Sequence, residues 1–238
     1  AYGDYNSVIQ TGSAVGAFYG YNALGVYASN SDVTVKNGVN DTNPFRGGDI
    51  IFEDVDDNGI IDENDRKVIG NTNPDMYGGF FNVFSYKSFD LSVFVDFAVG
   101  NDVYNAQRAS LEAMSNYDNQ STTINDRWRK EGDVTSMPRL SHGDATGNTR
   151  FSSRWLEDGS YARFKAITLG YNFPLKGIFK NVFKNARVLV TAQNLYTFSN
   201  YKGFSPEAGS ITNPIVYGAD YGNVPPLKTF MMGVKLGL

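Results

Sequence analysis

The sequence predicts an all-β protein and, more narrowly, a portion of an antiparallel transmembrane β-barrel with long extracellular loops. Three observations predict it: an aromatic, glycine-rich composition, strand-length segments that alternate apolar and polar residues, and short turns that alternate with long loops. The 238 residues include 15 Tyr, 17 Phe and 25 Gly but no Cys. Aromatic side chains favour strands and glycine favours turns, so this composition argues against a helix-rich fold.

Residues 89–99 form the clearest predicted strand. One face is wholly apolar because alternate positions hold Phe89, Leu91, Val93, Val95, Phe97 and Val99. A length of about 11 residues is typical of a tilted membrane strand, whereas strands of soluble sheets usually have five or six. Residues 229–238 repeat the pattern, with Phe230, Met232, Val234, Leu236 and Leu238 in one row.

Three further strands are predicted at residues 77–86, 161–173 and 186–198. Each has aromatic residues near one or both ends, where transmembrane barrels place aromatic girdles. A soluble β-sandwich or jelly roll, whose aromatic residues fill a core, is the alternative that periodicity leaves open. No window approaches 18 consecutive apolar residues, so a transmembrane helix is not expected.

The connections between these strands differ in length. Lys87 and Ser88 make a tight turn and residues 174–185 a moderate one, whereas residues 100–160 and 199–227 are long and rich in Asn, Ser and Gly. Short periplasmic turns and long extracellular loops are typical of outer-membrane barrels. If the C-terminus is periplasmic, counting strands backwards places both long loops and the acidic segment 49–70 outside the cell.

The acidic segment contains a twelve-residue pattern of the EF-hand type. Its positions 1, 3, 5, 7, 9 and 12 are Asp54, Asp56, Asn58, Ile60, Asp62 and Asp65, with Gly59 at position 6. Oxygen ligands at this spacing surround Ca²⁺, and the glycine permits the sharp turn. Asp65 stands where Glu is usual, so the sequence predicts a weak structural calcium site, with an Asp/Asn turn that satisfies its own backbone as the alternative.

Several classes of function are not expected. A net charge of -4 and a pI near 5.0 argue against a nucleic-acid partner, whose phosphates call for a basic surface. His142 is the only histidine, and no nucleophile elbow, phosphate loop or dinucleotide motif occurs in the sequence. The chain is therefore predicted not to be an enzyme.

Aromatic residues in the long loops are candidate ligand contacts. Flat rings beside Asn and Asp can stack on sugar or peptide ligands, or can contact a protein partner over a broad surface. The candidates are Trp128, Trp155, Tyr201, Tyr217 and Tyr221.

A series of short motifs resembles the SusC/RagA family of TonB-linked outer-membrane proteins. In order along the chain they are VGAFYGY at 15–21, DVDDNGIIDENDR at 54–66, GNDVYN at 100–105, LEDGSY at 156–161, ITLGY at 167–171, QNLYTF at 193–198, YKGFSPE at 201–207 and PPLKTF at 225–230. Each motif alone is weak, but the ordered series over nearly the whole chain is specific.

The resemblance implies the C-terminal part of an outer-membrane importer energised by TonB. Its barrel would have about 22 strands around a plugged lumen, of which this chain supplies about seven or eight. The expected partners are a SusD-like surface lipoprotein, outer-membrane lipid, a glycan or peptide substrate, and the TonB complex, reached through an N-terminal plug part outside these 238 residues.

The two functional interpretations differ in what covers the apolar row of residues 89–99. In a segment of a transporter barrel the row faces lipid. In a secreted, calcium-stabilised β-domain that binds carbohydrate, a second sheet must bury it.

Overall fold

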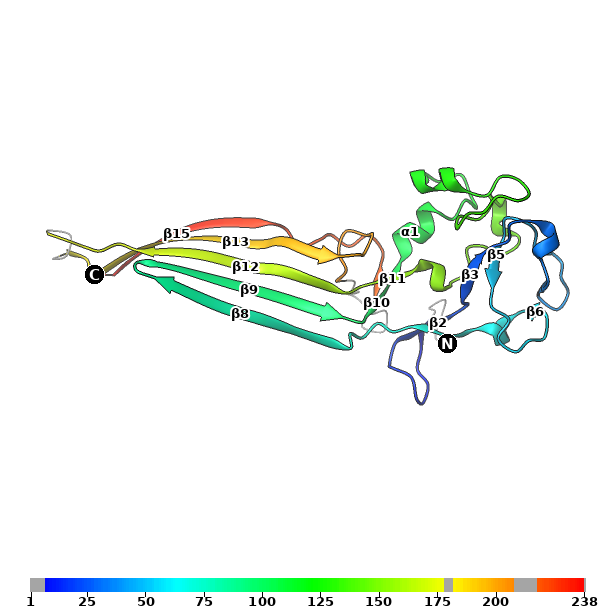
Figure 1. Ribbon diagram of the computed structural model, residues 1–238, viewed down its shortest axis with the longest axis horizontal. Coiled ribbons are helices and arrows are strands. Elements are labelled where there is room, and N and C mark those ends of the chain that lie inside the picture. Colours follow the sequence, from blue (N-terminus) through cyan, green and yellow to red (C-terminus); the bar gives the residue numbers. More distant parts are fainter. Residues whose placement is uncertain (1–6, 178–181, 208–217, 238) are drawn as a thin grey trace. The chain divides into compact units, whose positions relative to one another are not determined.

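The computed structural model describes residues 7–177, 182–207 and 218–237 and divides into two compact units (Figure 1). Unit 1 comprises Ala1–Asn73, Asn101–Glu157 and Glu207–Asn223. Unit 2 comprises Pro74–Gly100, Asp158–Pro206 and Val224–Leu238. The chain therefore alternates between the units, so each contains segments that are distant in sequence.

Unit 2 contains one five-stranded antiparallel sheet, whose long strands run side by side (Figure 1). The strands are β8 (Met76–Tyr86), β9 (Phe89–Val99), β12 (Tyr161–Asn172), β13 (Asn185–Ser199) and β15 (Thr229–Gly237). These are the five strands that alternation predicts, and each observed boundary lies within one residue of the predicted one. Their order is β15-β13-β12-β9-β8.

The sheet of unit 2 has two open edges. Among the described strands, β8 pairs only with β9, and β15 pairs only with β13. No sheet among the described residues is closed, so neither the size of the predicted barrel nor its strand count is visible in this chain.

The tight turn between β8 and β9 is the predicted one at Lys87 and Ser88. Tyr86 pairs with Phe89, and Lys87 between them has φ +53°, in the left-handed region. Two-residue hairpins require this conformation because it matches the twist of the flanking strands.

Unit 1 consists of short elements. Its strands are β1 (Ser7–Val8), β2 (Ala17–Gly20), β3 (Ala23–Val26), β4 (Lys36–Asn37), β5 (Ile50–Phe52), β6 (Ile60–Ile61), β7 (Lys67–Gly70), β10 (Asp102–Asn105), β11 (Leu156–Asp158) and β14 (Ala219–Asp220). The described residues of this unit also form the α-helix α1 (Ala106–Leu111) and the 3-10 turns η1 (Asn30–Asp32), η2 (Glu63–Asp65), η3 (Thr122–Asp126), η4 (His142–Asp144) and η5 (Ser153–Trp155). None of the helices in the described ranges has the length and apolar character needed to cross a membrane.

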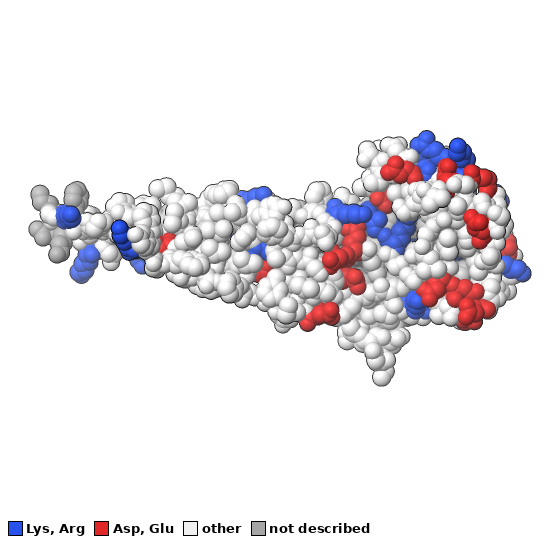
Figure 2. All heavy atoms as spheres, in the orientation of Figure 1, with Lys and Arg blue, Asp and Glu red and all other residues white. Residues whose placement is uncertain are grey.

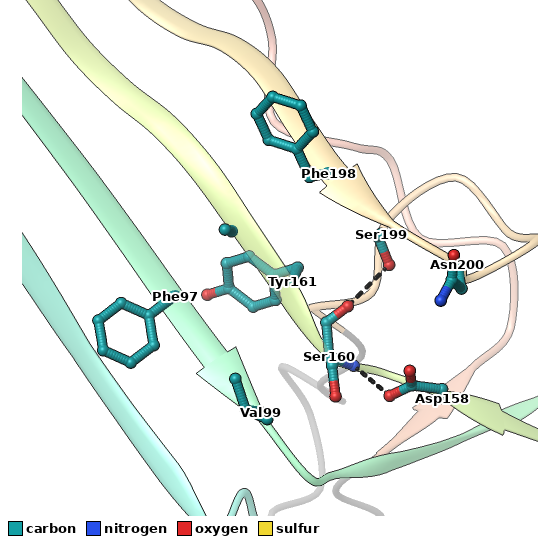
Figure 3. Close-up of a pocket in the computed structure, with 9 residues that line it drawn as sticks. Phe97, Val99, Asp158, Ser160, Tyr161, Phe198, Ser199 and Asn200 are labelled. Atoms are coloured by element: carbon teal, nitrogen blue, oxygen red, sulfur yellow. Dashed lines mark hydrogen bonds between the residues drawn. The ribbon is translucent and has the colours of Figure 1, made fainter.

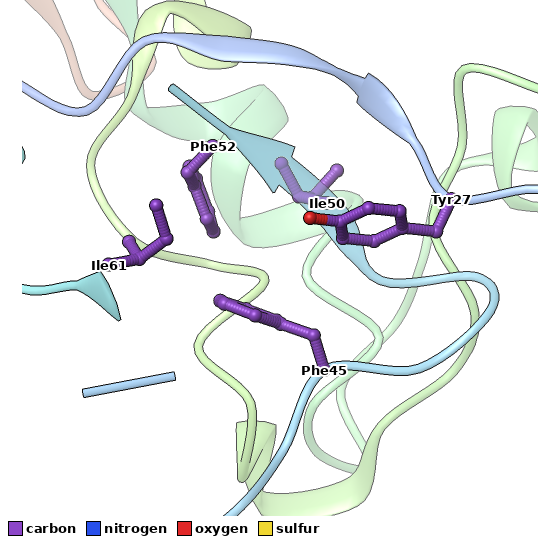
Figure 4. Close-up of a cluster of buried hydrophobic side chains, with 5 residues drawn as sticks. All are labelled: Tyr27, Phe45, Ile50, Phe52 and Ile61. Carbon is purple, nitrogen blue, oxygen red and sulfur yellow. The ribbon is translucent and has the colours of Figure 1, made fainter. Parts of the chain in front are cut away.

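The core of unit 1 lies around the antiparallel pair β3–β5. Ile50 and Phe52 point inward from alternate positions of β5 and pack with Tyr27, Phe45 and Ile61 (Figure 4). The rings of Phe45 and Phe52 lie 6.2 Å apart in a tilted arrangement, which is favourable for aromatic pairs.

A buried carboxylate ties the predicted loop 100–160 to the first segment of unit 1. Asp49 is fully buried and accepts hydrogen bonds from Arg139 Nε at 2.8 Å, Thr146 Oγ1 at 3.1 Å and Asn148 Nδ2 at 2.8 Å. The backbone N–H of Arg46 donates to it as well. The segment therefore packs as part of a folded unit, where the sequence alone predicts an irregular loop.

Candidate functional site

The cross-strand register of unit 2 collects apolar residues on one face of its sheet. Every second residue of β9, starting at Phe89, points to one side of the sheet. The cross-strand partners of these residues in the other four strands point to the same side. We call this side the apolar face; it consists of Met76, Gly78, Phe80, Asn82, Phe84 and Tyr86 of β8, Phe89, Leu91, Val93, Val95, Phe97 and Val99 of β9, Ala162, Phe164, Ile167, Leu169 and Tyr171 of β12, Ala186, Val188, Val190, Ala192, Tyr196 and Phe198 of β13, and Phe230, Met232, Val234 and Leu236 of β15. Asn82 is the exception among them.

Many side chains of the apolar face are exposed. Phe80 is 64% exposed, Phe84 60% and Met232 75%. An exposed apolar surface that spans five strands marks contact with a membrane or with another protein. Figure 2 shows one side of the long strands of unit 2, mostly uncharged with scattered Lys, Arg, Asp and Glu side chains.

Aromatic residues concentrate near the two ends of the apolar face. Near one end Phe89 lies 4.6 Å from Tyr171, between ring centroids. Near the other end Phe198 lies 4.6 Å from Tyr196 and 6.0 Å from Phe164. Aliphatic residues such as Val93 and Val190 lie between these groups. Two aromatic girdles that flank an aliphatic band are typical of membrane-spanning barrels.

The length of the apolar row fits the thickness of a membrane. Strand β9 has 11 residues. Ten steps of about 3.3 Å give roughly 33 Å, and a tilt of about 40° reduces this to a height of roughly 25 Å, the height of the apolar band in outer-membrane barrels.

The opposite face of the sheet carries paired polar groups. Arg187 contacts Asp90 at 2.5 Å and Lys165 contacts Asp96 at 2.9 Å. Further along, Thr168 and Thr191 share a hydrogen bond of 2.9 Å between their hydroxyl groups. We call this side the polar face. A water-filled lumen accommodates such pairs, whereas lipid does not.

A glycine makes room for the ion pair between Asp90 and Arg187. Gly170 lies in β12, between Asp90 of β9 and Leu189 of β13. A Cβ atom at position 170 would lie 2.5 Å from Arg187 Nη2 and 2.7 Å from Asp90 Oδ2. The ion pair therefore bridges β12 directly above the glycine.

A bulge at Lys165 keeps the two faces distinct. The register of β12 shifts between Phe164 and Ala166 against both neighbouring strands. Phe164 and Ile167 consequently lie on the apolar face although they are three residues apart, and Lys165 reaches Asp96 on the polar face. An extra residue in one strand changes which side its successors face, and here it preserves the separation of apolar from charged groups.

The acidic loop of unit 1 brings together three of the six predicted calcium ligands. Carboxylate oxygens of Asp54, Asp56 and Asp65 lie within 4.8 Å of one another. Asp54 accepts hydrogen bonds from the backbone N–H groups of Asn58 and Gly59. This arrangement fits both a calcium loop and a self-bonded Asp/Asn turn, so calcium binding stays a prediction.

The side chains of Asn58, Asp62 and Asp65 accept hydrogen bonds within the loop. The side chain of Asn58 accepts from the N–H of Ile60 at 2.7 Å, and Asp62 caps η2 by accepting from Asn64. Asp65 is fully buried and accepts from the N–H groups of Val55 and Asp62. Asp65, at position 12 of the loop, thus holds the loop backbone through these two hydrogen bonds.

Glu53 precedes this loop and forms an ion pair with Lys67 at 2.6 Å. The side chain of Asn22 donates a second hydrogen bond to it at 2.6 Å. Hydrogen bonds from Lys67 first, and then from Asn22, lower the pKa of Glu53 below its usual value of 4.5. The pair connects the start of the loop to β7.

The two tryptophans predicted as ligand contacts are engaged within unit 1. Trp155 is 1% exposed, and the guanidinium groups of Arg108 and Arg154 lie over its ring, 5.5 and 4.8 Å from the ring centroid. Burial lowers the pKa of Arg154 to about 10, against the opposing effect of Glu112. Trp128 is partly buried and donates through Nε1 to the carbonyl oxygen of Ala28.

The three predicted tyrosines have different surroundings. Tyr201 is buried within unit 2, whereas Tyr221 in unit 1 is 61% exposed and lies 6.5 Å from Tyr104 in an edge-to-face arrangement. Tyr217 lies outside the described residues. Tyr221 therefore offers the most open ring of the four described candidates, and a role in ligand binding stays a prediction for all five.

Comparison with known proteins identifies relatives over most of the chain. It is 36% identical to TonB-dependent receptor P3 of Formosa agariphila over 96% of its own length and 23% of the receptor. It is 30% identical to TonB-dependent receptor SusC of Bacteroides thetaiotaomicron over 78% of its own length and 17% of that protein. No family model matches the chain.

The fold of the chain is similar to part of a solved structure. The structure of the RagAB peptide transporter aligns with 99% of this chain and 25% of its own, with a TM-score of 0.72 at 21% identity. At this identity the likeness concerns the fold alone: strand-rich, all-β, with almost no helix. The chain is therefore an all-β protein whose fold is also found within such a transporter.

The chain belongs to the TonB-dependent receptors of the SusC/RagA kind. It spans about a quarter of the length of the curated relatives it matches. These relatives are TonB-dependent receptors, and that the chain is not an enzyme stays a prediction.

Proposed function

We propose that this chain forms part of the wall of a TonB-dependent nutrient importer in the outer membrane. The observation that carries the proposal is the apolar face, which unites five strands between two aromatic girdles. Such a face is stable against lipid and would be costly in water. The polar face, with its ion pairs, then lines the interior of the barrel.

The open edges of the sheet support a larger barrel. Backbone groups in lipid must be paired, so β8 and β15 need neighbouring strands within the membrane. The rest of a longer receptor would supply these strands and complete a barrel of about 22 strands around a plug. This chain would correspond to its C-terminal part, and the TonB complex would act through the N-terminal part.

The proposed substrates are glycans or peptides, taken up with a SusD-like surface lipoprotein as partner. One relative is the TonB-dependent receptor SusC, and the similar structure is that of the RagAB peptide transporter. Tyr221, with its exposed ring, and the loops 100–160 and 199–227 are the proposed extracellular contacts. The alternative of a secreted β-domain is not favoured, because the described part of unit 2 contains no second sheet to cover the apolar face.

Neighbouring residues on opposite faces of β9 test the proposal. In a full-length receptor that contains this chain, Val93→Arg places a charge on the apolar face, and an arginine near the middle of the membrane costs about 2–4 kcal/mol. We expect the amount of folded receptor in the outer-membrane fraction to fall several-fold. Ser92→Arg is the matched control, because Ser92 lies on the polar face and should tolerate the charge.

The result is read from outer-membrane fractions on unheated gels. Loss of the Val93→Arg variant with retention of the Ser92→Arg variant supports the membrane assignment. If both variants accumulate equally, or if the receptor is recovered without detergent, the proposal is wrong.

A further inference from the structure

The polar face of unit 2 carries an exposed apolar patch at its β8 edge. Tyr77, Phe81 and Val83 occupy alternate positions of β8 on this side of the sheet. Phe81 pairs with Phe94 of β9, and the two rings meet edge to face with their centroids 6.4 Å apart. We call these four residues the inner apolar patch. The side of the sheet that the proposed function assigns to the barrel interior is therefore only partly polar.

A glycine allows Phe94 to lie close against β8. A Cβ atom at position 79 would be 2.7 Å from Cε2 of Phe94. Glycines near a sheet edge are often covered in this way by an aromatic side chain of the neighbouring strand. Because Gly79 lies between Tyr77 and Phe81 along β8, the ring of Phe94 joins these side chains into one surface.

Polar and charged groups border the patch on the β12 side. At the loop end, Tyr161 lines a shallow hollow and extends from β12 toward β9 (Figure 3). The guanidinium group of Arg163 lies 5.1 Å from the centroid of that ring. Further along the sheet, Lys165 forms its ion pair with Asp96. The apolar surface is therefore confined to the β8 side of the polar face.

The inner apolar patch is more exposed than a surface in permanent contact with water should be. Tyr77 is 79% exposed, Phe81 64% and Val83 55%. Covering a single phenylalanine favours the covered state roughly ten- to a hundredfold. Apolar patches of this kind mark contact with protein or membrane. Since the opposite face meets lipid in the proposed orientation, the contact here is with protein.

A resident domain fits this surface better than a passing substrate does. A substrate occupies the lumen only during uptake and would leave the patch in water at all other times. A domain joined to the barrel by the same polypeptide stays beside it at a high effective concentration. The chain spans about a quarter of the length of its curated relatives, and barrels of about 22 strands have a plugged lumen.

We propose that the inner apolar patch holds the plug of the full-length receptor in its closed position, through an apolar surface on the plug. Displacement of the plug uncovers Tyr77, Phe81 and Val83, so the patch sets part of the energy that opening requires. The inference rests on the proposed function, because it requires the polar face to line the barrel.

Phe80 and Phe81 provide a matched pair for testing this contact. They are adjacent in β8, each is 64% exposed, and they point to opposite faces of the sheet. In the full-length receptor each is replaced in turn by the photoreactive residue benzoylphenylalanine. The membranes are illuminated and the crosslinked products are mapped by mass spectrometry. We expect the probe at position 81 to label the plug and the probe at position 80 to label lipid.

Channel recordings measure the energetic part of the inference. In planar lipid bilayers without TonB, a receptor with Phe81→Ser should open roughly ten- to a hundredfold more often than the parent. Phe80→Ser removes the same ring from the apolar face and should leave the opening frequency unchanged.

Three results would overturn the plug contact: no labelling of the plug from position 81, labelling of an added substrate peptide from that position instead, or equal opening frequencies in both serine variants. If position 80 labels lipid while position 81 does not label the plug, only this inference is contradicted. If position 80 does not label lipid, the proposed function itself is contradicted.

Discussion

Asp90 of β9 and Arg187 of β13 form an ion pair across the strand that separates them, with an N–O distance of 2.5 Å. The pair passes over Gly170 of β12, where a Cβ atom would meet both partners. The glycine leaves the space in which the ion pair crosses β12.

Gly170→Ala is expected to destabilise the folded receptor by about 1–3 kcal/mol, since the added methyl group must displace both charged groups. The measurement is the midpoint of heat-induced conversion to the unfolded gel band. In an Asp90→Ala background the same substitution should cost clearly less, because Arg187 is then free to move away. An equal cost in both backgrounds would mean that the ion pair does not limit the space at position 170.

The stability of unit 1 should depend on pH through Glu53. Lys67 and Asn22 hold the pKa of its carboxyl group below 4.5 in the fold, so the carboxylate stabilises the fold above this pH. That contribution is lost as the pH falls below 4.5 and through the lowered pKa. We expect Glu53→Gln to weaken the protection of β3 and β5 amides from hydrogen exchange at pH 7, but much less at acidic pH. Protection factors corrected for the intrinsic pH dependence of exchange are the readout, and a difference that does not change with pH would contradict the role of Glu53.

The calcium hypothesis for the acidic loop predicts a response to metal removal. Asp54→Ala combined with Asp56→Ala should make the loop as sensitive to protease in calcium as the parent is in a chelator, because a bound ion stabilises only the folded loop. Glu63→Gln removes one charge outside the group of three carboxylates and is the control. Equal cleavage of the parent loop with and without calcium would leave the self-bonded turn as the correct interpretation.

The five strands of unit 2 were predictable because their signal is local. Alternation in β9 indicates its length and its apolar row, and the register adds partners of the same character from four other strands. The bulge was harder to predict, because the apolar rows of β12 occupy even positions up to Phe164 and odd positions from Ile167. This change of parity is the sequence signal that could have located it.

The packing of unit 1 was not predictable from local patterns. Its connections depend on single polar contacts such as Arg139 with Asp49, which are 90 residues apart and leave no periodic trace. The same limit applies to Trp155, since loop composition predicts exposure while the ring is buried and contacted by two arginines. The proximity of Asp54, Asp56 and Asp65 was predictable from their spacing in the sequence. The turn that brings them together lies within the same loop, at Gly59.

The unpaired edges of β8 and β15 have a consequence for any isolated piece of such a receptor. Each edge presents a row of backbone donors and acceptors that another copy can match, so a separated sheet is a template for polymerisation. Growth of this kind has no natural end point in an open sheet. In a closed ring the last strand meets the first, and ring closure thereby sets a finite size on an assembly that would otherwise continue as a fibre.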